Sequence, residues 1–165
     1  MITWGWTGMS HDASLAVFKD KQLVFASHAE RYSRIKNDKN LNTWLLSDAL
    51  LEFGEPDRVY FYETPWLKKT RQLYAGQYNL LKKQSPTTHM RKIFKDAPRS
   101  ISTNHHLSHA AAGYFTSEFT DCAILCIDSI GEWDTTSIWT AQGNHLKKLW
   151  SLRYPDSVGI WYSGM

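Results

Sequence analysis

Residues 104–115 read Asn-His-His-Leu-Ser-His-Ala-Ala-Ala-Gly-Tyr-Phe. The three consecutive alanines favour a helix that begins near His106, and Asn104 is a suitable N-cap for it. His105 and His109 are four residues apart, so a helix presents both side chains on one face. Two imidazole nitrogens can therefore converge on one cation.

An apolar run follows this helix, where residues 123–128 read Ala-Ile-Leu-Cys-Ile-Asp. The run is typical of a buried strand, and Asp128 then lies at its carboxyl end, where open α/β sheets place ligand chemistry. Two histidines and a carboxylate form a ligand set with open positions, as in non-haem iron and catalytic zinc sites. The alternative is a surface helix with solvated histidines and an Asp that only ends a strand. The spacing alone leaves both interpretations open.

The amino-terminal part of the chain predicts a three-stranded meander followed by a helix and a fourth strand. The expected strands are 2–7, 15–18 and 23–26, the helix is 41–53 with Gly54 just past its end, and the last strand is 58–62. This β-β-β-α-β order is that of the opening of a ribonuclease-H-like lobe, the unit that actin-like and sugar-kinase folds duplicate.

A second copy of this opening is indicated near the carboxyl end. Residues 123–127 are followed by a polar loop and by a hairpin of 136–141 and 146–152, turned at Gly143-Asn144. In each copy an Asp precedes the second strand, Asp12 in the first and Asp134 in the second. The predicted fold class is α/β, with a ribonuclease-H-like, actin-like lobe over residues 1–120 and the opening strands of a second, incomplete lobe over 121–165.

Composition excludes few functions. The 165 residues are 42% hydrophobic with a formal charge of +3, which suits a globular chain with a core and does not by itself indicate nucleic acid. No apolar run reaches the roughly 18 residues of a membrane span, and the amino terminus lacks a basic, cleavable leader pattern. A cytoplasmic protein without membrane association is the default expectation.

Residues 66–99 form a basic insertion, which we expect to be a helix pair broken near Ser85-Pro86. This segment has one acidic residue, Asp96, and many basic ones. The basic residues are Lys68, Lys69, Arg71, Lys82, Lys83, Arg91, Lys92, Lys95 and Arg99. Interleaved aromatics permit a nucleic-acid surface. A solvated helix face with an aromatic inner stripe is the more common outcome of such a pattern.

Four blocks of sequence, in this order, resemble the nodulation-protein and antibiotic O-carbamoyltransferases. They are His11-Asp12-Ala13-Ser14, Glu30-Arg31-Tyr32-Ser33-Arg34-Ile35-Lys36, Asn104 to Ala112, and Ile127-Asp128 with Gly131 to Ser137. The resemblance covers residues 4–162. It implies that the chain is the amino-terminal part of an enzyme that transfers a carbamoyl group to a hydroxyl acceptor.

The resemblance also implies cofactors, co-substrates and roles. Family members convert carbamoyl phosphate and ATP into a carbamoyl adenylate in a YrdC-like domain, and then pass the carbamoyl group to a small-molecule alcohol at an iron site. His105, His109 and Asp128 match the iron ligands, and the fourth ligand, a downstream Asp, has no counterpart here. His11 matches a first-loop histidine that could deprotonate the acceptor hydroxyl.

Further residues are candidates for binding nucleotide or phosphate. Cations after the third expected strand can hold phosphate oxygens by charge-assisted hydrogen bonds, and the two Asp-containing loops are the expected phosphate turns of the two lobes. The candidates are Asp12, Ser14, Arg31, Arg34, Lys36, Asp134 and Thr135.

Such an incomplete enzyme is expected to bind a divalent metal weakly and not to transfer carbamoyl groups unaided. A second lobe and a YrdC-like domain, from the same gene or a separate chain, would complete it. Its second sheet is expected to expose apolar surface and to form homo-oligomers or precipitate. Two alternatives stay open: a nucleotide-binding, sugar-kinase-like domain, and a non-catalytic remnant or binding module.

Overall fold

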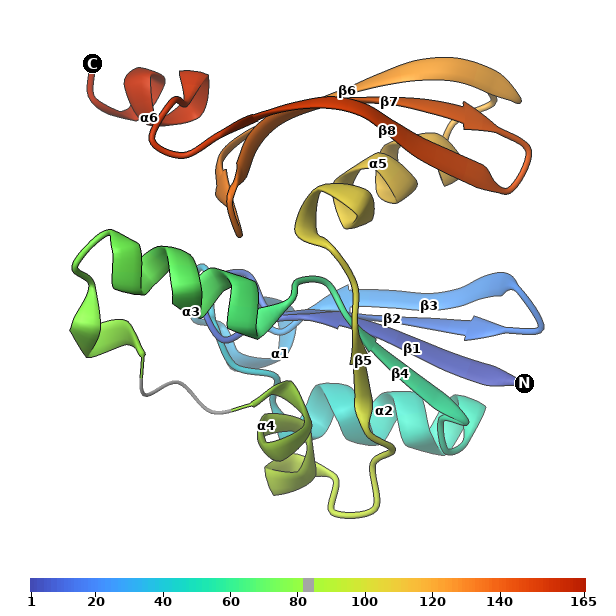
Figure 1. Cartoon of the computed structure of the whole chain (residues 1–165). Helices are drawn as coiled ribbons and strands as arrows, with labels where there is room; N and C mark the ends of the chain where they lie inside the picture. Colours follow the sequence, from blue (N-terminus) through green and yellow to red (C-terminus); the bar gives the residue numbers. More distant parts are fainter. Residues whose placement is uncertain (82–84) are drawn as a thin grey trace. The chain divides into compact units, whose positions relative to one another are not determined.

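The computed structural model describes residues 1–81 and 85–165, so Lys82 and Lys83 of the basic insertion lie outside the described residues (Figure 1). The chain divides into two compact units. The first contains residues 1–62 and 85–102, and the second contains residues 63–81 and 103–165. The division into 1–120 and 121–165 stays a prediction. Within the described ranges, no helix is long and apolar enough to cross a membrane.

A five-stranded mixed sheet forms the first unit. Its strands are β1 (Ile2–Thr7), β2 (Ser14–Lys19), β3 (Gln22–His28), β4 (Arg58–Phe61) and β5 (Ser100–Ser102), in the order β3-β2-β1-β4-β5. The meander β1-β2-β3 is antiparallel, whereas β4 and β5 extend the sheet parallel to β1. The expected order of strands and helix is confirmed, with one short addition, α1 (Glu30–Ser33).

Local capping signals set the helix boundaries of this unit. Helix α2 (Thr43–Phe53) begins two residues later than predicted, because the Asn42 side chain accepts a hydrogen bond from the Leu45 amide at 2.9 Å. Helix α4 (Pro86–Ile93) begins directly after its cap Ser85, which confirms the predicted break.

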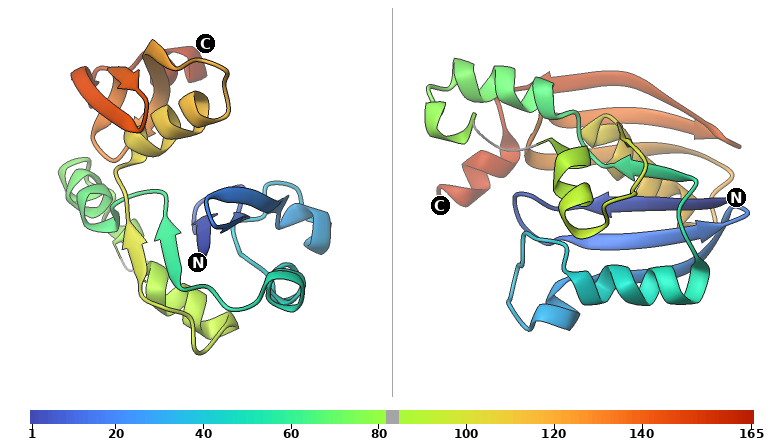
Figure 2. Two further views of the ribbon diagram at one scale, coloured as in Figure 1. Left: turned by 90° about the vertical axis from the view of Figure 1, so that its right-hand side faces the viewer. Right: turned by 90° about the horizontal axis from the view of Figure 1, so that it is seen from below.

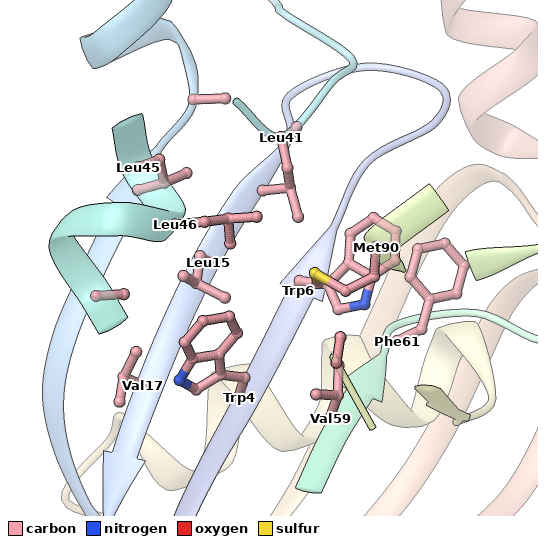
Figure 3. Close-up of a cluster of buried hydrophobic side chains, with 14 residues drawn as sticks. Trp4, Trp6, Leu15, Val17, Leu41, Leu45, Leu46, Val59, Phe61 and Met90 are labelled. Carbon is pink, nitrogen blue, oxygen red and sulfur yellow. The ribbon is translucent and has the colours of Figure 1, made fainter. Parts of the chain in front are cut away.

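Alternate residues of the strands point into one apolar core, shown in Figure 3. Trp4 pairs with both Val17 and Val59 across the sheet, and the whole set is fully buried. Helices α2 and α4 cover this face and lie in front of the strands in the right-hand view of Figure 2, adding Leu45 and Met90 to the core. The loops at the ends of the strands therefore extend from a well-packed sheet.

The second unit is built on a three-stranded antiparallel sheet. Its elements are α3 (Pro65–Tyr74), a 3₁₀ turn at Tyr78–Leu80, α5 (His105–Phe115), β6 (Asp121–Gly131), β7 (Asp134–Gln142), β8 (His145–Arg153) and α6 (Val158–Ser163). Strand β6 is longer than predicted, so Asp128 does not end it. The ladder between β6 and β7 is irregular between Ile127 and Gly131, and Asp128 instead follows the last regular pair.

Helix α5 packs on one face of this sheet (Figure 1), and the opposite face, here called the open face, exposes apolar side chains. Ala110 of α5 meets the buried Cys126 and Trp139 on the covered face. On the opposite face Leu125, Ile138 and Trp150 are in register across the three strands. Leu125 is 62% exposed and Trp150 is 50% exposed, so the open face is apolar.

Copies of the chain are expected to associate through this open face, because removing a contiguous apolar patch from water lowers the free energy. Replacing Leu125 and Ile127 with threonine keeps strand propensity but reduces the apolar area, and is expected to shift the chain towards monomer in size-exclusion chromatography with light scattering. Leu51→Gln, at an 86% exposed position on α2, is the control that leaves association unchanged. A wild-type chain that is monomeric at high concentration contradicts this expectation.

In the basic insertion, the buried and exposed side chains are not those that the sequence predicts. Arg71 is only 6% exposed, with its guanidinium carbon 6.0 Å from the centre of the Tyr154 ring, while Trp66, Tyr74 and Tyr78 are each more than 60% exposed. The prediction of an aromatic inner stripe under a solvated basic face is therefore wrong. The stem and flat head of Arg71 can pack against a ring, so a basic residue takes the inner position.

Candidate metal centre

The first turn of α5 presents the two candidate histidines. Asn104 is the N-cap, as predicted, and its side chain accepts a hydrogen bond from the Leu107 amide at 3.1 Å. The helix that follows places His105 and His109 one turn apart. Their Nε2 atoms lie 3.0 Å from one another.

The irregular segment of β6 brings Asp128 to the same place. Asp128 Oδ1 accepts a hydrogen bond from the Ser129 amide at 2.7 Å. Its Oδ2 lies 2.9 Å from His105 Nε2 and 3.8 Å from His109 Nε2. One ligand atom from each of the three residues lies within 4.8 Å of the others. The structure therefore brings together the three residues that the sequence predicts as ligands.

The three side chains differ in exposure, which gives the cluster an open side. The His105 side chain is 12% exposed and that of Asp128 is 25% exposed, whereas His109 is 54% exposed. Solvent reaches the cluster from the His109 side. His105 is the inner member of the set.

Electrostatics couple His105 to Asp128. Burial would lower the pKa of His105, but the nearby carboxylates of Asp128 and Glu63 outweigh burial and raise this pKa to about 9. Burial would raise the pKa of Asp128, yet its bond to His105 lowers that pKa to about 2. The pKa of His109 is lowered, first by burial and then by the neighbouring His105. The proton that His105 Nε2 donates to the Asp128 carboxylate lies where a cation would be coordinated.

Two residues that sequence reasoning missed lie against His105. Gly131 allows the ring to approach the β6 backbone, since a Cβ atom built there would overlap His105 Cδ2 and lie 2.8 Å from His106 Cδ2. Glu63 is buried, and its Oε2 lies 3.8 Å from His105 Nδ1. Glu63 follows the end of β4 in sequence, and the strand-end rule applied to Asp128 would have found it.

Glu132 joins the start of α5 to the β6–β7 turn. Its carboxylate accepts hydrogen bonds from the amides of Thr64 and His105 and from the Asn104 side chain, and only 3% of the residue is exposed. Its hydrogen bonds are to amide groups that precede α3 and that begin α5, so Glu132 fixes the position of the His105 backbone.

Three of the phosphate candidates of the first unit surround one cavity. This cavity of about 440 Å³ is lined by Asp12, His28, Glu30, Arg34, Ile35, Lys36 and Asn37. The structure thus groups Asp12, Arg34 and Lys36. Ser14 does not line the cavity, and its hydroxyl is 3.0 Å from that of Thr7, while Arg31 is directed to Glu30 at 3.9 Å.

His11 lies beside Asp12 in the same loop. Its Nδ1 is 2.8 Å from Asp12 Oδ2, and the Asn37 amide donates to Asp12 Oδ1 at 2.8 Å. These bonds, first that of Asn37 and then that of His11, lower the pKa of Asp12. His11 itself is 74% exposed. A carboxylate on Nδ1 leaves Nε2 as the basic nitrogen.

The remaining two candidates differ in what they offer. Asp134 lies in a cavity of about 370 Å³ lined by Leu67, Asn104, Glu132, Trp133, Asp134, Lys148 and Arg153. It is buried and binds Lys148 Nζ at 2.8 Å and Arg153 Nε at 3.4 Å. Thr135 is fully buried, and its hydroxyl donates to the Asp156 carbonyl at 2.6 Å and lies 3.2 Å from the Leu152 carbonyl oxygen.

Comparison with known proteins places this α/β chain, with its two histidines and carboxylate, in a family of transferases. Residues 63–165 match the family model described as carbamoyltransferase N-terminus. The chain belongs to this family, which confirms the resemblance seen in its sequence.

Two relatives illustrate the extent of the match. An uncharacterized protein of Synechocystis is 34% identical over 180 aligned positions, which cover 93% of this chain and 29% of that protein. The nodulation protein NolNO of Sinorhizobium fredii is 25% identical over 165 positions, which cover 92% of this chain and 24% of that protein. The chain thus spans less than a third of the length of either relative.

Proposed function

We propose that this chain is the amino-terminal part of an enzyme that transfers a carbamoyl group to a hydroxyl acceptor, with a divalent metal held by His105, His109 and Asp128. The observation that carries the proposal is the convergence of three ligand atoms within 4.8 Å in a carbamoyltransferase-family chain. Mixed nitrogen and oxygen ligands suit Fe²⁺, which is the metal we propose.

The residues fit such an ion. A bound divalent cation supplies Lewis acidity that polarises a carbonyl or phosphoryl oxygen. The Ser129 amide occupies Asp128 Oδ1 and leaves Oδ2 directed at both imidazoles. The exposed side at His109 leaves room for a substrate to approach, and the burial of His105 excludes water from the inner side.

The cavity at Asp12, Arg34 and Lys36 is the proposed site for a phosphate group of the nucleotide. Two cations can hold phosphate oxygens there, and the left-handed backbone at Arg34 (φ 59°) directs this end of α1 into the loop. Lys148 and Arg153 flank Asp134 in the second unit and line a second cavity, whose two cations are balanced by Asp134 and Glu132. ATP and carbamoyl phosphate are the proposed co-substrates.

His11 is the proposed general base for the acceptor hydroxyl. Asp12 accepts from Nδ1, which sets the tautomer and leaves Nε2 to take the proton. The side chain is largely exposed, so an acceptor alcohol can reach it.

The finer fold assignment belongs to the same proposal. A β-β-β-α-β unit followed by an antiparallel sheet with an Asp at its turn is what a ribonuclease-H-like, actin-like lobe and the opening of a second lobe require. The proposed partners are the rest of the second lobe and a YrdC-like domain that forms the carbamoyl adenylate.

A nucleotide-binding experiment tests this function. ATP is titrated under anaerobic conditions into the chain in the presence of Fe²⁺, and calorimetry measures the affinity. The double variant His105→Ala, His109→Ala is expected to lose at least about tenfold in affinity, equivalent to about 1.4 kcal/mol of binding free energy, since the metal would contact the nucleotide.

His145→Ala, in the β7–β8 hairpin, is the control that removes an imidazole elsewhere in the unit. If the double variant binds ATP as tightly as the wild type, the metal set is not part of the nucleotide site and a sugar-kinase-like domain is favoured. No binding of ATP by the wild-type chain contradicts the proposal.

A further inference from the structure

Glu63 is a buried carboxylate of the second unit that lies between β4 and α3 in the sequence. Its side chain is 6% exposed. Lys68 Nζ donates to both carboxylate oxygens, at 2.9 Å to Oε1 and 3.0 Å to Oε2. Burial of a carboxylate is costly unless its oxygens are paired, and Lys68 provides this pairing from one turn inside α3.

The two ring nitrogens of His105 face different carboxylates. Nε2 lies 2.9 Å from Asp128 Oδ2, and Nδ1 lies 3.8 Å from Glu63 Oε2. The ring is almost enclosed, so its orientation is set by the groups that contact it. Gly131 supports the same orientation by leaving no side chain against the Cδ2 edge.

A histidine that binds a metal through Nε2 carries its proton on Nδ1, and that proton needs an acceptor in a buried place. Glu63 is the carboxylate on that side of the ring. The separation of 3.8 Å is that of an ion pair, and hydrogen bonds of active sites are often long in the absence of their ligands and tighten when the ligands are bound. A carboxylate behind a metal-bound imidazole also makes the ring a stronger donor.

We propose that Glu63 is the positioning residue of the metal centre: it accepts the Nδ1 proton of His105 and holds Nε2 towards His109 and Asp128, while Lys68 fixes the Glu63 carboxylate. This inference rests on the proposed metal set. Glu63 itself does not touch the metal or the reacting groups.

The opposing explanation is a purely structural ion pair that ties α3 to the unit. In that case removal of either partner lowers stability and neither changes the metal. The positioning role instead predicts that the two partners are unequal. Removing Glu63 takes the acceptor from His105, whereas removing Lys68 leaves the acceptor in place.

Cobalt(II) is the probe, because its visible absorption reports the coordination of the ion. The chain is titrated with Co²⁺, and the dissociation constant and the d–d spectrum are recorded for the wild type, Glu63→Gln and Lys68→Met. Glu63→Gln is expected to weaken Co²⁺ binding about 10- to 100-fold and to change the spectrum. Lys68→Met is expected to weaken binding less than Glu63→Gln.

Thermal unfolding without metal separates positioning from stability. Tyr114→Phe is the matched control, since Tyr114 is also buried on the same unit and its hydroxyl donates to the Thr120 carbonyl at 2.8 Å, at the far end of α5. This control is expected to lower Tm and leave the Co²⁺ affinity unchanged.

The outcomes are distinct. If the wild type binds Co²⁺ and Glu63→Gln binds it equally well with the same spectrum, the positioning role is overturned and the metal set stands. Equal losses in Glu63→Gln, Lys68→Met and Tyr114→Phe also overturn it, because affinity then follows stability. If the wild type binds no Co²⁺, the metal set itself fails.

Discussion

Replacing Gly131 with alanine is expected to displace the His105 ring and so to weaken metal binding. The added methyl group would overlap the His105 ring and lie 2.8 Å from His106 Cδ2. His105 is held by Asp128 on its other side, and His106 is fully buried with Nδ1 2.6 Å from the Ser137 hydroxyl. Neither ring can retreat without losing a bond.

The expected cost is that of overpacking a well-filled core, about 1–3 kcal/mol of unfolding free energy. Displacement of His105 Nε2 from the other two ligands is expected to lower the affinity for Co²⁺ at least about tenfold, equivalent to about 1.4 kcal/mol. Denaturant unfolding and metal titration measure the two effects.

Gly113→Ala provides a matched control on α5. No atom lies within 4 Å of a Cβ built at Gly113, and the residue is within the helix. Alanine is expected to stabilise the helix by about 0.5–1 kcal/mol there without changing the metal affinity. If Gly131→Ala behaves in the same way as Gly113→Ala, the close approach of the His105 ring to β6 is wrong.

The stability of the chain in the presence of a chelator is expected to fall as the pH rises from about 6.5 to about 9. The pKa of His105 is about 9 in the folded chain and near 6.5 when unfolded, so the folded state binds the extra proton in this range. The stabilisation is complete below about 6.5 and is lost as the pH rises through the folded pKa.

At low pH the same ion pair makes the stability of the chain change with pH in the opposite direction. The pKa of Asp128 is about 2 when folded and 3.8 in its ordinary state, so stability is lost as the pH falls from about 3.8 towards 2. Both titrations involve the His105–Asp128 ion pair, and Glu63 contributes to that of His105 as well. Shifts of this size correspond to about 2–3 kcal/mol each.

Asp128→Asn tests this assignment by removing the charge with little change in shape. Urea denaturation at pH 6 and pH 9.5 is expected to show a clear difference in midpoint for the wild type and a smaller one for the variant. Asp121→Asn, on the same strand, is the control. An unchanged pH dependence in Asp128→Asn would show that another group titrates.

Local signals in the sequence predicted the elements of the candidate site well. Asn104 and the alanine run act within one or two turns, so the start of α5 and the shared face of His105 and His109 follow from neighbours in the chain. The hairpin turned at Gly143 is equally local, since Gly143 has the left-handed φ of 55° that such turns need.

Contacts between distant segments could not be predicted in this way. Glu63 and Gly131 matter because they meet His105. The position of Glu63 just after β4 marks it as a candidate, but nothing near either residue in the sequence shows that its partner is His105. Arg71 likewise packs near the ring of Tyr154, which lies far along the chain. Among the phosphate candidates, sequence order grouped Ser14 and Arg31 with Arg34, but strand pairing and exposed ion pairs direct the first two elsewhere.

The turn at Glu132 has a consequence for the way the second unit moves. Glu132 has a left-handed backbone (φ 57°), which is unfavourable for a residue with a side chain. Its carboxylate nevertheless accepts hydrogen bonds from Thr64, before α3, and from Asn104 and His105 at the start of α5. These bonds offset the unfavourable backbone conformation and connect the β6–β7 turn to the starts of α3 and α5. We expect the sheet and the first turn of α5 to fluctuate as a single rigid body. Thermal motion would then carry both histidines and Asp128 together and would preserve their spacing.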